Sequence, residues 1–169
     1  MSDYPSYALV LSDLLAERQA LRDLERQVAK ELEQREDEED AKRRERLDEF
    51  RMTDDMRRLL TTKLKHAISC GETELMLLSF ASEFCSDGGR AVANASPSDP
   101  GHGAQHMKGE PPWLATLPKG IYSLYRFWRD CLEQGGFGFE ARIVCYPEGR
   151  TGDVGLFVTW PQSASRHMN

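Results

Sequence analysis

Residues 7–50 constrain this chain most, because they form a long, charge-dense segment that contains neither glycine nor proline. Leu, Ala, Glu, Arg, Gln and Lys dominate it, and these residues have high helix propensity. Pro5 lies just ahead of the segment, and Ser6 or Ser12 is placed to cap its start. We therefore expect one extended helix of roughly 44 residues, about 66 Å long at a rise of 1.5 Å per residue.

Apolar residues recur along one side of the first half of this segment. They step by 7, 3, 4 and 4 positions, at Leu14, Leu21, Leu24, Val28 and Leu32. This spacing is typical of a helical stripe that follows a heptad for two turns and then drifts. Residues 33–49 are charged almost throughout, with acids four positions ahead of bases, as in Glu39 and Arg43. Each such pair adds only about 0.2–0.5 kcal/mol to a helix.

A narrow apolar stripe on a polar helix has to be buried against something. A second copy of the chain is the simplest partner, because it brings a matching stripe, and the result would be a homodimeric coiled coil. Two alternatives remain open. The helix folds back on its own domain, or it is a docking arm for a different protein. The predicted interface residues are the same in each case: Leu14, Leu21, Leu24, Val28 and Leu32.

The net negative charge of the chain lies in this arm. Residues 1–50 hold 15 acidic and 9 basic side chains, a balance of −6, whereas residues 51–169 hold 13 of each. Non-specific binding of nucleic acid or of an anionic membrane requires clustered positive charge. The charge distribution therefore counts against both partners.

The sequence also indicates a compartment. No apolar run approaches the roughly 18 residues of a membrane span, and the N-terminus lacks the pattern of a secretory signal. The four cysteines are dispersed without CxxC spacing, at Cys70, Cys85, Cys131 and Cys145. We therefore expect a cytoplasmic protein whose cysteines are buried free thiols.

The body, residues 52–162, is expected to open with a helix that begins at Thr53, a capping residue followed by two acids. The helix is expected to end near Gly71, and its apolar set is Met56, Leu60, Leu64, Ala67 and Ile68. Arg51, Arg58 and Lys65 recur every seven residues on one face. That pattern is typical of a solvated face, and the alternative is a surface for nucleic acid or an acidic partner.

Three further stretches have the length and pattern of strands. Glu74–Ala81 is a compact apolar run without alternation, which favours a central strand buried on both faces. Residues 139–145 and 154–160 alternate with period two, and the turn residues at 147–152 predict an antiparallel hairpin. Helices are predicted at 88–94 and at 117–134. The second has an apolar stripe of Ile121, Leu124, Tyr125, Trp128, Cys131 and Leu132.

The predicted fold class is α+β. A coiled-coil-like arm, residues 1–51, precedes an α-β-α-α-β-β domain with helices packed on a three-stranded sheet. Residues 95–112 are expected to form a flexible loop and 163–169 a disordered tail. His102 and His106 stand four apart in this loop, but Pro100 and the neighbouring glycines oppose a helix there. No set of four ligands is complete, so we expect neither a metal nor a cofactor.

One segment of the body has features of a ligand site. Residues 82–90, SEFCSDGGR, join a strand to a helix through two glycines, and such junctions present backbone N–H groups to anions. Glu83, Asp87 and Arg90 are the candidate binding residues, although Asp87 would itself repel an anion. Cys85 is a candidate nucleophile, because a helix N-terminus lowers the pKa of a nearby thiol. The alternative is that Cys85 packs in the core and Asp87 caps the helix.

These features favour a regulatory or scaffolding protein that dimerises or docks through its N-terminal helix. The first alternative is a small-anion binder or cysteine-dependent enzyme with its site at 83–90. The second is a nucleic-acid-binding regulator that uses the face of Arg51, Arg58 and Lys65. No residue pattern indicates a particular reaction, so the sequence argues against an enzyme rather than for one.

Overall fold

The structure of the protein, a computed structural model, describes residues 10–95 and 109–162. Its contacts divide the chain into two compact units, the first ending at Arg43 and the second starting at Arg44. The predicted start of the arm at residue 7, the loop histidines His102 and His106, and the tail 163–169 lie outside the described residues.

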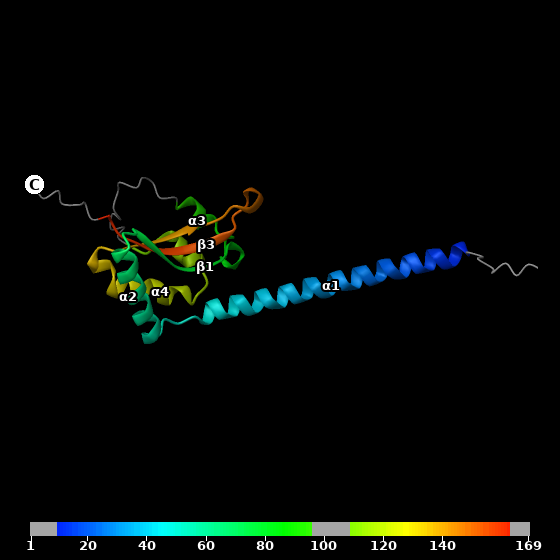
Figure 1. Cartoon of the computed structure of the whole chain (residues 1–169), viewed down its shortest axis with the longest axis horizontal. Helices are drawn as coiled ribbons and strands as arrows, with labels where there is room; N and C mark the ends of the chain where they lie inside the picture. Colours follow the sequence, from blue (N-terminus) through cyan, green and yellow to red (C-terminus); the bar gives the residue numbers. More distant parts are fainter. Residues whose placement is uncertain (1–9, 96–108, 163–169) are drawn as a thin grey trace, which may run out of the picture. The chain divides into compact units, whose positions relative to one another are not determined.

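Helix α1, Leu11–Glu49, is continuous over 39 residues (Figure 1). At a rise of 1.5 Å per residue it is about 58 Å long. Asp13 lies in its first turn and Arg46 in its last, where their charges complement the helix dipole. Arg43 forms the expected ion pair with Glu39, at 3.7 Å. The prediction of a long N-terminal helix is confirmed.

The second unit contains a three-stranded antiparallel sheet with the strand order β1-β3-β2. The strands are β1 (Glu74–Ala81), β2 (Gly138–Ile143) and β3 (Asp153–Thr159). Strands β2 and β3 form the predicted hairpin, in which Ala141 pairs with Leu156. The predicted α+β class, with a small domain built on three strands, is therefore confirmed.

The prediction that Glu74–Ala81 is the central strand is wrong, because β3 lies between the other two strands. The register of β1 against β3 shifts between Met76 and Leu78, as at a β-bulge. The bulge allows Leu77 and Leu78, which are adjacent in sequence, both to pack against the core from an edge strand. Residues 154–158 of β3, by contrast, are buried without interruption. This is the pattern of a strand covered on both faces.

Helix α2, Asp54–Ser69, begins where its sequence predicts. The Thr53 hydroxyl oxygen accepts a hydrogen bond from the Met56 amide at 3.3 Å and caps the helix. Of the predicted apolar set, Leu64 and Ala67 are buried and Leu60 is half-buried, whereas Met56 and Ile68 are exposed. The remaining helical segments of the described chain are α3 (Arg90–Asn94), α4 (Ile121–Cys131) and the short 3₁₀ turns η1 (Ser82–Phe84), η2 (Pro112–Thr116), η3 (Glu133–Gly135) and η4 (Pro147–Gly149).

The core lies between one face of the sheet and the helices that cover it; α2 and α4 lie on the same side of the sheet in Figure 1. Ile121 of α4 and Leu156 of β3 are completely buried there. Turn η2, which was not predicted, adds Trp113 and Leu114 at the end of the expected loop. The core residues are Phe80, Cys85, Val92, Trp113, Leu114, Leu117, Ile121, Leu124, Tyr125, Ala141, Val154 and Leu156.

The predicted helix at 117–134 is shorter in the structure, because Pro118 and Gly120 precede its first turn and η3 follows it. Cys131 is exposed rather than buried, whereas Phe127, which was not predicted, is 4% exposed. Phe127 lies two turns after Gly120 on the same side of α4. A methyl group built at Gly120 would be 2.1 Å from the Leu47 carbonyl oxygen, so the chain at the end of α1 covers this side of the helix at its start.

Arg142 covers the face of the sheet opposite to the core. Its guanidinium lies 4.5 Å from the ring centroid of Phe157, a buried residue of the central strand. The same group forms ion pairs with Glu74 of β1 at 2.7 Å and with Glu140 of β2 at 2.9 Å. Arg142 therefore joins all three strands across this face.

Candidate functional site

The predicted interface residues of α1 lie on one exposed face of the helix. The apolar stripe, as we call it, consists of Leu14, Leu21, Leu24, Val28 and Leu32, whose exposed fractions lie between 43% and 61%. At about 100° per residue these side chains fall within an arc of about 80°. Leu15 is also exposed, but it points about 135° away from the middle of the stripe.

Residues 11–43 of helix α1 have few stabilising contacts of their own. No residue of the helix is buried. The side-chain contacts of this part are exposed pairs, such as Arg26 with Asp23 at 3.5 Å and Gln27 with Glu31 at 3.3 Å. Exposed pairs of this kind contribute a few tenths of a kcal/mol each. The apolar stripe is therefore the feature of α1 through which packing would add most stability.

The junction at residues 82–90 is held by its own capping interactions. One carboxylate oxygen of Asp87 accepts a hydrogen bond from the Gly89 amide at 3.0 Å, and the other accepts one from the Ala91 amide at 2.7 Å. These are the amide groups that an anion would need at the start of α3, and α3 has only five residues. The arrangement agrees with the alternative in which Asp87 caps the helix.

Cys85 is a core residue with an exposed fraction of 5%. Burial, and then the nearby Asp87 carboxylate, raise the pKa of its thiol from 9.0 to about 11. The expected lowering of this pKa does not occur, because the Asp87 carboxylate occupies the helix start and the thiol is desolvated. A thiol with this pKa is almost entirely protonated at neutral pH and is a poor nucleophile.

Glu83 and Arg90, the other candidates at this junction, both have exposed side chains. The Glu83 backbone carbonyl accepts a hydrogen bond from the Arg44 guanidinium at 2.9 Å, and the same guanidinium lies over the Phe84 ring at 5.7 Å. Neither contact uses the Glu83 carboxylate. A ligand-binding role for Glu83, Asp87 and Arg90 therefore remains a prediction.

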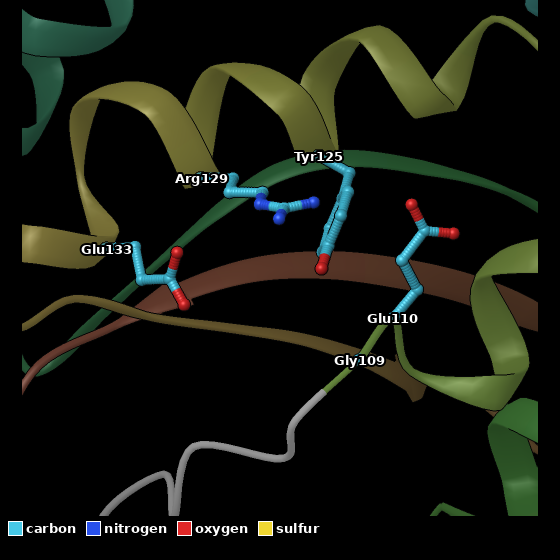
Figure 2. A pocket seen from close by; sticks show the side chains of 5 residues that line it. All are labelled: Gly109, Glu110, Tyr125, Arg129 and Glu133. Carbon is cyan, nitrogen blue, oxygen red and sulfur yellow. The ribbon is translucent and has the colours of Figure 1, made fainter.

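A small polar cavity of about 170 Å³ lies beside α4 (Figure 2). Tyr125 and Arg129 point into it from the helix, and Glu110 faces them from the opposite side (Figure 2). The Tyr122 hydroxyl donates a hydrogen bond to Glu110 at its edge. Burial raises the pKa of Tyr125 above its usual value, so its hydroxyl is neutral at physiological pH. The cavity has room for ordered water or a small polar group, and its residues do not indicate a reaction.

A wider groove of about 330 Å³ lies between α2 and the start of β1. Lys63 and His66 of α2, together with Glu72 and Leu75, form part of its lining. His66 lies near Cys70, with 3.6 Å between its Nε2 and the cysteine Sγ. No group of three or more potential ligands in the described parts of the chain is arranged to hold a metal ion.

The four cysteines are free in the structure, but only Cys85 is buried. The expectation of buried thiols is therefore wrong for Cys70, Cys131 and Cys145, which lie at the end of α2, at the end of α4 and after β2. A small side chain at an element terminus does not have to enter the core. These three thiols are available to reagents in solution.

The basic residues Arg51, Arg58 and Lys65 are all exposed. Helix α2, which contains Arg58 and Lys65, also carries Asp54 and Asp55 in its first turn, and Arg57 pairs with Asp54 at 3.9 Å. The surface is therefore mixed in charge, and nucleic-acid binding through it remains a prediction. Within residues 10–95 and 109–162, no helix has the length and apolar character needed to cross a membrane.

Comparisons of the chain with protein-family models, with curated proteins and with solved structures gave no match.

Proposed function

We propose that the protein is a scaffolding or regulatory interaction protein that pairs with a second copy of itself through the apolar stripe of α1. The observation that supports this most strongly is the exposure of all five stripe side chains on a helix that has no buried residue. Most helices in proteins depend on the packing of an apolar face for their stability. Pairing would supply that packing along the segment from Leu14 to Leu32.

A second copy is favoured as the partner because it carries the same stripe at the same spacing. The stripe is narrow, which suits the seam of two paired helices better than a broad docking groove. Residues 11–32 hold five acidic and four basic side chains, so two such segments do not strongly repel each other. The strongly acidic part of α1 begins only after the stripe ends, at Glu33.

The expected affinity is modest. Burying the exposed part of one leucine or valine contributes about 1 kcal/mol, so the two stripes together contribute about 10 kcal/mol. Association costs about 4–15 kcal/mol in lost freedom. The dissociation constant is therefore expected to be tens of micromolar or weaker, and further attraction is needed to make the dimer tight.

Sedimentation equilibrium of the full chain over a wide concentration range tests this proposal. We expect a reversible monomer–dimer equilibrium. Leu24→Gln places two amides in the seam of each dimer, and we expect it to raise the dissociation constant about tenfold or more. Leu15→Gln is the matched control, because it makes the same change on the same helix away from the stripe.

Two results would contradict the proposal. One is a mass that stays at the monomer value of 19.2 kDa at every concentration. The other is a dimer that Leu24→Gln and Leu15→Gln weaken to the same small extent, because the seam would then lie elsewhere. Circular dichroism of each variant would establish that α1 remains helical.

A further inference from the structure

The exposed face that carries the apolar stripe also carries charged residues. Glu17 lies on it between Leu14 and Leu21, and Arg35 lies on it one turn after Leu32. At about 100° per residue both fall within the same arc of about 80° as the stripe. Both side chains are exposed. Two charges of opposite sign therefore lie in the seam that a paired helix would cover.

Glu17 and Arg35 are equally distant from the midpoint between Leu24 and Val28 along the helix. When two copies of α1 lie antiparallel about this midpoint, Glu17 of each copy is opposite Arg35 of the other. Leu24 then meets Val28, and Leu21 lies close to Leu32, in the layers between the two charged positions. These apolar layers would thus be bracketed by an ion pair at each end. Leu14 lies outside them, opposite Glu38 of the second copy.

Parallel pairing in register has the opposite electrostatic result. It places Glu17 against Glu17 and Arg35 against Arg35 in the seam, where like charges are unfavourable. It also brings the five consecutive acids of residues 36–40 beside the same five of the second copy. In the antiparallel arrangement these two acidic blocks are roughly 35 Å apart, which is more than three times the screening length of about 10 Å at 0.1 M salt.

The intrachain contacts leave both charged positions available. In the parts of the chain that the structure describes, the ion pairs within α1 are Arg26 with Asp23 and Arg43 with Glu39 and Asp40. Glu17 and Arg35 take part in none of these. Their pairing with a second copy would therefore break no ion pair within α1.

We infer that α1 pairs antiparallel with α1 of a second copy, centred between Leu24 and Val28, with Glu17 of each chain paired to Arg35 of the other. This inference rests on the proposed function, because it specifies the partner's orientation and register at the same surface. It also supplies an attraction beyond that of the apolar stripe alone.

Charge reversal in the full chain tests the orientation. Glu17→Arg makes both charges of each seam pair positive at the two ends of an antiparallel dimer, and Arg35→Glu makes both negative. We expect each single variant to raise the dimer dissociation constant about tenfold at low salt, since two attractive pairs become repulsive. The double variant Glu17→Arg/Arg35→Glu restores both pairs with their signs exchanged, so its dissociation constant should return to within about threefold of the original.

Matched controls change the net charge equally on the outer side of the helix. The side chains replaced in Glu33→Arg and Arg22→Glu point more than about 110° away from the middle of the stripe. We expect these variants to change the dissociation constant less than about threefold. Raising the salt concentration should shrink the effects of the seam variants.

The outcomes separate this inference from the proposed function. A chain that is monomeric at all concentrations contradicts the pairing itself. Alternatively, Leu24→Gln weakens the dimer, but the single seam reversals change its dissociation constant no more than the controls do. That result would support the proposed function and contradict the antiparallel register. The antiparallel register would also be contradicted if the dissociation constant of the double variant were no lower than that of the single variants.

Discussion

At the scale of single residues, Cys85 and Asp87 bear on the hypothesis of a cysteine-dependent enzyme, which remains a prediction. Burial raises the pKa of the Cys85 thiol, and the Asp87 carboxylate that caps α3 raises it further. The residue types alone predicted that Asp87 caps a helix. They did not establish whether Cys85 faces the core or the helix end, because that depends on how η1 turns the chain after β1.

We predict that Cys85 resists alkylation in the folded protein. With a pKa of about 11 its thiol is protonated near pH 8, and the side chain is buried. Iodoacetamide labelling followed by peptide mapping should modify Cys70, Cys131 and Cys145 and leave Cys85 unmodified. In concentrated guanidinium all four should react. Rapid modification of Cys85 in the native chain would contradict its assignment to the core and would support the nucleophile hypothesis.

The raised pKa of Cys85 also makes the stability of the folded protein depend on pH. The folded state raises the thiol pKa from 9.0 to about 11, so it holds the proton more tightly than the unfolded chain does. The resulting contribution to stability is fully present below pH 9 and is lost as the pH rises through 11.

At the scale of elements, hydrogen bonds join the chain at the end of α1 to the chain at the start of α4. The Asp48 carboxylate accepts a hydrogen bond from the Lys119 amide at 2.9 Å, and the Ser123 hydroxyl accepts one from the Met52 amide at 3.2 Å. Gly120 lies between these contacts, and a methyl group there would be 2.7 Å from the Phe50 nitrogen. This close backbone approach requires a residue without a side chain.

We predict that Gly120→Ala destabilises the body by about 2–4 kcal/mol, although alanine normally favours a helix, because the added carbon collides with backbone that cannot move freely. Gly135→Ala is the control, since its added carbon meets only the Phe137 ring at 3.4 Å. Urea unfolding followed by tryptophan fluorescence measures the change, because Trp113, Trp128 and Trp160 all lie in the body. A Gly120→Ala variant as stable as the original chain would show that these elements are not in close contact.

The elements themselves differ in how far the sequence predicts them. The composition of α1 and the cap at Thr53 are local signals. As expected from them, α1 is continuous and α2 begins directly after Thr53. The place of β1 at the edge of the sheet is not local, because it depends on pairing with a strand more than 70 residues away. The apolar run of β1 resembles a central strand that is buried on both faces. The bulge instead lets adjacent apolar residues pack on one face of an edge strand.

At the scale of the whole molecule, the uneven charge and the position of the apolar stripe along one helix are the features that follow most directly from the sequence. Both follow from composition and spacing along one uninterrupted helix. The polar cavity of Tyr125, Arg129 and Glu110 was not predictable, because it joins a helix residue assigned to the core with one from the expected loop. The proposed orientation of the partner helix could be inferred only after Glu17 and Arg35, the charged residues on the same face, were considered together with the apolar stripe.

Hydrogen–deuterium exchange of the full chain, at concentrations well above and well below the dissociation constant expected for the proposed dimer, tests the central claim most directly. If the apolar stripe is buried against a second copy, amides of residues 21–32 should exchange more slowly at high concentration, because pairing stabilises the helix there. Amides of β3, in the core of the body, should exchange equally at both concentrations. Exchange of residues 21–32 that does not depend on concentration would contradict the account.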